Sequence, residues 1–136
     1  MQTGSLVTYP CPIRFCGLEG NTFTVATQTL GDELRPGADF AETARAFVKH
    51  TVMLEAKRTL LRYNVSDANA DVIADAVGDA FAAHYSGDAD PALRIPVDTG
   101  KLSLWGRIVY ATQRYVLDGL WAPTPIPDNN ASFRLD

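Results

Sequence analysis

DFAETARAFVKHTVMLEAKRTLLRYNVS, residues 39–66, decides the fold of this chain. Asp39 and Glu42 have the spacing of a capping box, in which the two side chains satisfy free backbone amides at the start of a helix. Large apolar residues then recur every seven positions at Phe40, Phe47, Leu54 and Leu61. Ala46, Met53 and Leu60 widen this stripe, which predicts a helix over about residues 40–63 with a broad buried face.

Complementary charge is the second feature of this region. Residues 64–66, Asn-Val-Ser, interrupt the first helix, and Ser66 is placed to cap a second helix over about 67–85. The first helix is basic, with Arg45, Lys49, Lys57, Arg58 and Arg62. The second carries Asp67, Asp71, Asp75 and Asp79 and has no lysine or arginine. We expect an antiparallel pair with some charge complementarity.

Residues 6–29 read as a β-hairpin on the N-terminal side of the helices. Apolar and polar residues alternate over about 11–18 and 22–29, with the turn signal Glu19-Gly20-Asn21 between them. Pro10 and Pro12 are two apart, so both missing amide donors face one edge. The first strand is therefore expected to be an edge strand, or to reach out to another protein.

A third helix and a proline-containing arm complete the chain. Apolar spacing predicts the helix over about 101–118, and Gly119 suits its C-terminal end. In residues 122–136, prolines at every second position exclude a helix or a central strand. The sequence therefore predicts one α+β domain over residues 1–121, followed by an extended arm that its own domain or a partner must hold.

Composition limits the classes of function. The chain has 136 residues, of which 46% are hydrophobic, and these values suit one globular domain. A net charge of −4 argues against a protein that binds nucleic acid by neutralising phosphates. No signal-peptide pattern is visible, and no apolar run approaches the ~18 residues of a membrane span. We expect neither secretion nor a membrane partner.

The aspartate series invites a metal hypothesis that its spacing does not support. Asp67-Ala-Asn69-Ala-Asp71 matches the first half of a calcium loop. The match then fails, because Val72 replaces the required glycine and Gly78 replaces the bidentate glutamate. We interpret the aspartates as a solvated helix face and predict no metal site.

Catalytic constellations are also not apparent. His50 and His84 each lie on or near the apolar side of a predicted helix, which favours packed core histidines over a site. Cys11 and Cys16 are too far apart in an extended strand to form a bridge, so we expect free thiols. No Gly-rich phosphate or dinucleotide loop is present. We predict no catalytic residue, no cofactor and no enzyme, and an enzyme of unfamiliar type is the remaining possibility.

Residues 96–102, Pro-Val-Asp-Thr-Gly-Lys-Leu, carry the one family resemblance. They resemble the PVDTG-[KR]-L signature of small neck and tail-completion proteins of tailed phages. In that family the signature follows a long helix, as it does here, but the segment after it is largely extended, whereas residues 101–118 have helical spacing. The resemblance implies a ring-forming virion component without catalysis.

We therefore expect a non-enzymatic structural subunit of a larger assembly, most concretely a head–tail joining, tail-completion or decoration protein of a tailed phage. Its partners would be further protein subunits, as a homo-oligomer or as neighbouring virion proteins, and its location the virion or otherwise the cytoplasm. The expected interface residues are Pro10, Pro12, Arg107, Arg114, Trp121, Pro123, Pro125, Pro127, Phe133 and Leu135.

The competing hypothesis is a small cytosolic ligand-binding or regulatory protein. In that case His50, His84 and the aromatic residues of the third helix would line a helical pocket. Trp105, Tyr110 and Tyr115 suit either the core or an interface.

Overall fold

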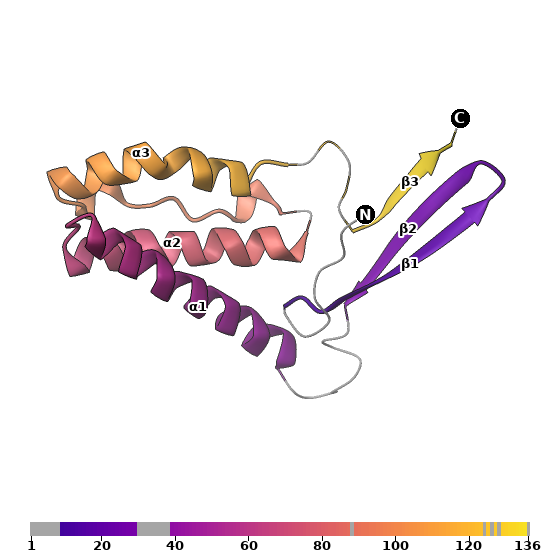
Figure 1. Ribbon diagram of the computed structural model, residues 1–136, viewed down its shortest axis with the longest axis horizontal. Coiled ribbons are helices and arrows are strands. Elements are labelled where there is room, and N and C mark those ends of the chain that lie inside the picture. The colour runs from indigo at the N-terminus through magenta and orange to yellow at the C-terminus, as the bar shows by residue number, and fades with distance from the viewer. Residues whose placement is uncertain are drawn as a thin grey trace.

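The computed structural model describes residues 9–29, 39–87, 89–123, 125, 127 and 129–135. Its elements (Figure 1) are, in chain order, β1 (Pro12–Glu19), β2 (Thr22–Thr29), α1 (Phe40–Arg62), α2 (Asp67–Ser86), the short 3-10 helices η1 (Pro91–Leu93) and η2 (Thr99–Lys101), α3 (Leu104–Leu120) and β3 (Ala131–Arg134). This confirms the predicted α+β class, with an N-terminal hairpin followed by three helices. Residues 6–8 of the expected hairpin lie outside the described residues.

The junction between α1 and α2 lies where the sequence predicts it. Asn64 has a φ of 57°, the left-handed conformation that ends many helices. Val65 is buried beside it, and Ser66 occupies the N-cap position of α2. Neither Asp39 nor Ser66 makes a side-chain capping hydrogen bond, so these helices start at the predicted residues without the predicted caps.

Helix α3 begins three residues later than predicted. Residues 99–101 form η2, in which the Asp98 side chain accepts a hydrogen bond from the backbone nitrogen of Gly100. Ser103 is the true N-cap, since its hydroxyl accepts from the backbone nitrogen of Gly106 at 3.2 Å. The capping serine therefore places the start of the helix at Leu104.

Helix α2 lies between α1 and α3, as Figure 1 shows. The face of α2 toward α1 is built from small residues, and a Cβ added at Gly78 would lie 2.8 Å from the backbone oxygen of Lys49. Ala70, Ala74 and Ala80 are fully buried. Small side chains allow the two helix backbones to approach closely, and the core gathers around α2.

The predicted buried face of α1 is wrong in its main residues. Phe40, Phe47, Leu54 and Leu61 are all exposed, and Phe47 keeps 71% of its surface accessible. Leu60, predicted beside the stripe, is buried as expected, and so is Val48, which was not predicted. The small residues of α2 and the ion pairs between α1 and α2 fix the rotation of α1 about its own axis. In this rotation the large apolar stripe faces away from the core.

The three strands form one antiparallel sheet in the order β1–β2–β3. One row inside the last pairs, which are Glu19 with Thr22 and Thr22 with Arg134, Leu18 lies opposite Phe23, and Phe23 lies opposite Phe133. The backbone nitrogen of Leu135 donates to the oxygen of Asn21. The end of the arm is therefore held by its own hairpin, and no partner is needed to order residues 131–135.

The sheet projects beyond one end of the helical layer (Figure 1). β1 and β3 are its two edges, with β2 between them. Asn129 and Asn130 bond to Thr27 of β2, where the chain returning from α3 enters the sheet. The helical layer and the sheet are thus joined by connecting segments at one end of the molecule.

Candidate interaction surfaces

A row of large apolar side chains follows the outer side of α1. We call Phe40, Phe47, Leu54 and Leu61 the α1 stripe. At ~1.5 Å of rise per residue the stripe is about 30 Å long. Residues seven apart share one side of a helix, and the buried residues Val48 and Leu60 lie outside that side. The α1 stripe is therefore a row of exposed apolar side chains about 10 Å apart along the helix, with Thr43, His50, Thr51 and Arg58 exposed between them.

A shorter apolar row follows the outer side of α3. We call Leu104, Ile108 and Tyr115 the α3 stripe, and Tyr115 is 72% exposed. The buried residues of the same helix, Val109 and Leu117, lie on its other side. The spacing of the α3 stripe is that of one helix face, and it covers about 16 Å of axis at ~1.5 Å per residue.

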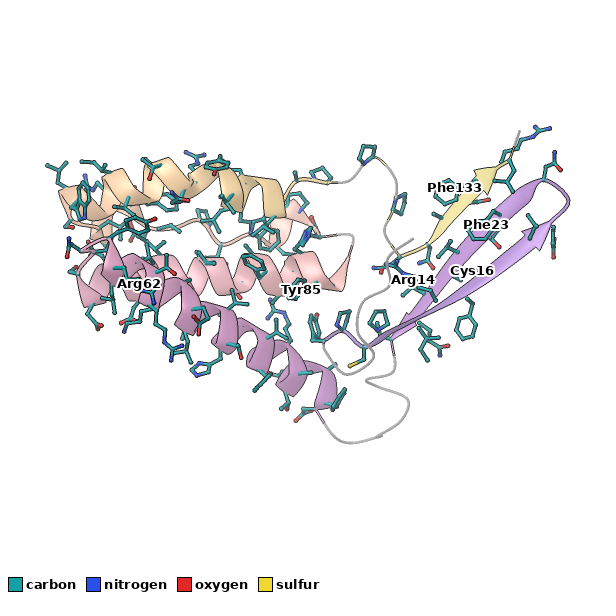
Figure 2. All side chains as sticks on the ribbon, in the orientation of Figure 1. Arg14, Cys16, Phe23, Arg62, Tyr85 and Phe133 are labelled. Atoms are coloured by element: carbon teal, nitrogen blue, oxygen red, sulfur yellow. The ribbon has the colours of Figure 1, made fainter. Side chains whose placement is uncertain are left out.

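Near the hairpin turn the sheet has an apolar row on one face and polar residues on the other, although farther from the turn the polar face also carries Ile13 and Phe15. Leu18, Phe23 and Phe133 share a row on the apolar face, where Figure 2 shows Phe23 and Phe133 on neighbouring strands. Successive residues point to opposite faces, so Thr24 and Ser132 lie on the other side. Leu18 remains 63% exposed. The apolar face is consequently only partly covered within the described residues.

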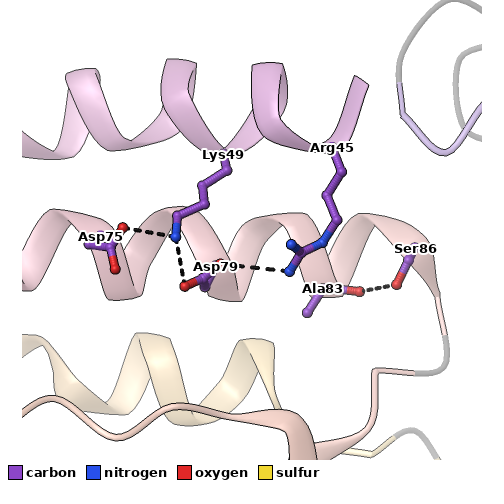
Figure 3. A network of polar contacts seen from close by, with 6 residues as sticks. All are labelled: Arg45, Lys49, Asp75, Asp79, Ala83 and Ser86. Atoms are coloured by element: carbon purple, nitrogen blue, oxygen red, sulfur yellow. Dashed lines mark hydrogen bonds and ion pairs between the residues drawn. The ribbon is translucent and has the colours of Figure 1, made fainter. Parts of the chain in front are cut away.

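The aspartates of α2 are ion-paired with α1 rather than forming a freely solvated face. Lys49 Nζ lies 2.8 Å from Asp75 and 2.9 Å from Asp79, and Arg45 lies 3.6 Å from Asp79 (Figure 3). Partial burial lowers the pKa of Lys49, but its hydrogen bonds to Asp75 and Asp79 outweigh that effect and raise the pKa above its usual 10.5. The predicted charge complementarity is confirmed.

A second set of ion pairs lies nearer the junction between the two helices. Lys57 Nζ is 3.1 Å from Asp67 and 2.6 Å from Asp71, and its hydrogen bonds to Asp71 and Asp67 raise its pKa. Asn69, the middle member of the calcium-like pattern, is buried in the helix. No group of three potential metal ligands occurs among the described residues.

The depressions between elements are shallow and lined by groups that already have partners. One of about 440 Å³ lies among Arg45, Lys49, Asp79 and Trp121. Neither His50 nor His84 is among its lining residues. Both histidines are exposed, which corrects the prediction that they are core residues.

The aromatic residues predicted near α3 divide between the core and the surface. Trp121 is 7% exposed and belongs to the core with Tyr110, so the expected interface role of Trp121 is replaced by a packing role. Trp105 and Tyr115 are exposed. The indole nitrogen of Trp105 donates to the backbone oxygen of Tyr63, which ties the start of α3 to the end of α1.

The two arginines expected at an interface both lie on the exposed side of α3. Arg107 Nε donates to the backbone oxygen of Leu102 at 3.1 Å. Arg114 Nε lies 3.3 Å from Asp118, which also pairs with Arg94 at 2.7 Å. Arg114 is thus part of a local ion-pair group, and Arg107 is held by a backbone carbonyl.

The prolines and the end of the arm occupy different environments. Pro12 is buried at the start of β1, opposite Thr29, and Pro10 is half-buried just before it. Pro123, Pro125 and Pro127 are exposed, as are Phe133 and Leu135 of the sheet, so this group of residues is not brought together in one site.

The cysteines carry free thiols, as expected, with Cys11 buried and Cys16 exposed. Within the described residues no helix combines the length and hydropathy that crossing a membrane requires. Comparisons of the chain with protein-family models, curated proteins and solved structures found no match.

The sequence analysis missed the outward direction of the α1 stripe and the existence of the α3 stripe. Seven-residue spacing shows that the residues of the α1 stripe share a face, but it does not show which neighbour that face meets. The residues of the α3 stripe, Leu104, Ile108 and Tyr115, are spaced by four and seven, so the sequence does indicate that they share a face. These surfaces, with the sheet face, are the candidate functional surfaces of the protein.

Proposed function

We propose that this protein is a non-enzymatic structural subunit of a larger protein assembly. The most concrete version is a head–tail joining, tail-completion or decoration protein of a tailed phage. Its function is then to present apolar surfaces that other subunits cover.

The α1 stripe is the observation that carries the proposal. Four large apolar side chains are exposed in a row on one side of a single helix, and exposed apolar surface of this kind often marks a site of interaction with another protein. The α3 stripe and the apolar sheet face add two further patches on other elements. A chain with three such surfaces is suited to contact more than one neighbour.

The phage version is supported by the resemblance of residues 96–102 to neck and tail-completion proteins. In this chain the segment has a structural role, because Asp98 caps η2 and Leu102 is buried in the core. The segment that follows is α3, a helix, whereas it is largely extended in that family. The support therefore comes from the short signature and the helix before it.

The ligand-binding alternative has less support. It relies on His50 and His84 lining a helical pocket, and both side chains are exposed. Lys49 and Asp79 line the depression of about 440 Å³, and they form an ion pair with each other.

The test is the mass of the purified chain measured by light scattering over a range of concentrations. We expect a defined oligomer, which Phe47→Ser weakens because it removes the most exposed residue of the α1 stripe. Thr59→Ser, at an exposed position of the same helix outside the α1 stripe, is the matched control and leaves the mass unchanged. A monomer at all concentrations, with unchanged thermal stability on adding candidate partners, contradicts the proposal.

A further inference from the structure

The α1 stripe has the period of a surface that packs against another helix. Phe40, Phe47, Leu54 and Leu61 repeat every seven residues, and this repeat keeps a stripe facing a neighbouring helix as the pair supercoils. Thr51 is exposed between the large residues on the same side, whereas Ala44 is partly buried near Cys11 and Ser86. The smaller residue at the middle of the stripe leaves room for a side chain of a facing helix.

We propose that a second copy of this chain covers the α1 stripe, with the two α1 helices packed antiparallel around a two-fold axis near residues 50 and 51. This inference rests on the proposed function and names one of its contacts. The contact is isologous, so each copy gives the same surface to the other.

The order of residue sizes favours the antiparallel arrangement. The N-terminal half of the stripe carries Phe40 and Phe47, and the C-terminal half carries Leu54 and Leu61. Antiparallel packing sets each phenylalanine half against a leucine half, so the volume is even along the seam. Parallel packing would set the phenylalanines together at one end and the leucines at the other.

The exposed area of the α1 stripe suits a weak dimer. From their exposures the four side chains offer about 350 Å² of accessible surface per copy, taking ~150–250 Å² for a whole aromatic side chain. Two copies therefore contribute about 700 Å² from these side chains, roughly half of the ~1,200 Å² at which specific interfaces begin, and the residues beside them must supply the rest.

Length favours a second α1 over the α3 stripe as the occupant. The α3 stripe covers about half the length of the α1 stripe, at ~1.5 Å per residue for both, so it would leave part of the α1 stripe uncovered.

Single-cysteine crosslinking tests the geometry directly. The background is Cys16→Ser, which removes the exposed thiol and leaves buried Cys11 in place. Thr51→Cys places a thiol beside the proposed axis, so we expect it to form a disulfide-linked dimer under mild oxidation. In the antiparallel dimer, the thiol of Phe40→Cys lies about 30 Å along the helix from the same thiol of the second copy, at ~1.5 Å per residue, and the same holds for Leu61→Cys. Neither variant therefore crosslinks alone, but a mixture of the two variants does.

Solution mass supplies the second readout. We expect Phe47→Ser with Leu54→Ser to weaken the dimer at least tenfold, while Tyr115→Ser on the α3 stripe leaves it unchanged; circular dichroism confirms that each variant is folded. Crosslinking of Phe40→Cys alone shows a parallel pair and overturns the proposal. An oligomer that survives the α1 substitutions and dissociates with Tyr115→Ser overturns this inference but keeps the proposed function. A monomer overturns this inference, and it overturns the proposed function as well only if candidate partners leave its thermal stability unchanged.

Discussion

The side-chain oxygen of Asn69 accepts two hydrogen bonds from Ser103, one from the backbone nitrogen at 2.9 Å and one from the hydroxyl at 2.6 Å. Ser103 in turn caps α3 through Gly106. Asn69 is the only buried polar residue among the described residues, so this pair of contacts positions the start of α3 on α2.

Substituting Asn69 by alanine removes both acceptor contacts. The backbone amide of Ser103 then loses its partner in a partly buried place, which costs about 1–3 kcal/mol of unfolding free energy. Urea denaturation followed by circular dichroism measures the loss. Gln113→Ala, at an exposed position of α3, is the control and stays within about 0.5 kcal/mol of the parent. Equal stability of the two variants contradicts this account.

Gly106→Ala is expected to destabilise the protein although alanine favours helices. Its Cβ would lie 2.5 Å from the Asn69 side-chain oxygen, so the hydrogen bonds to Ser103 must move. Gly119→Ala in the same helix has nothing within 4 Å and is expected to gain about 0.5–1 kcal/mol. The two glycines therefore respond with opposite sign in the same denaturation experiment.

The clash at Gly106 also predicts coupling between the two sites. In Asn69→Ala with Gly106→Ala the added methyl group no longer meets an amide, so the double variant loses less stability than the sum of the single losses. If the two single losses of stability add within about 0.5 kcal/mol, the destabilisation by Gly106→Ala does not arise from the contact with Asn69.

Sequence patterns predicted the existence of the helices more accurately than their orientation. Periodicity shows which residues share a face, and α1 has two candidate faces. The stripe with Phe47 has the larger side chains, but Val48 and its neighbours fit against Gly78 and leave Lys49 within reach of Asp75. Which face of α1 is buried depends on the surface of α2, and the sequence of α1 alone does not determine it.

Strand β3 could not be predicted for a different reason. Its partner Phe23 lies more than one hundred residues before Phe133, and such distant pairing leaves no local pattern. The prolines that precede the strand indicate only an extended chain. The late start of α3 is a local error, because Ser103 followed by a helical stretch is a recognisable cap.

Acid is expected to remove the contribution of Asp118. Its hydrogen bond with Arg94 lowers the pKa of Asp118 below the usual 3.8, partial desolvation opposes this, and the charges of Arg94 and Arg114 add to the lowering. A lowered folded pKa gives stability that is present above 3.8 and is lost as pH falls through the folded value. The melting temperatures of the parent and Asp118→Asn are therefore expected to differ at pH 7 and to converge below pH 3. A difference that is constant with pH contradicts this assignment.

Removing β3 is expected to affect the sheet and spare the helices. A chain ending at Asn130 leaves β1 and β2 as a lone hairpin, which is marginal in water, and uncovers Phe23. We expect amide protection of β2 to fall in hydrogen exchange, while α1 and α2, which have their own core, keep theirs.

Phe133→Ala tests the same strand with its backbone intact. Phe133 faces Phe23 across the two strands, so its loss is expected to cost the sheet about 1 kcal/mol. Ser132→Ala lies on the polar face opposite Thr24 and is the matched control. If protection of α2 falls together with that of β2 in the Phe133 variant, the sheet and the helical layer unfold as one unit. If only β2 responds, they are separate cooperative units, and the sheet can separate from the helices without unfolding them.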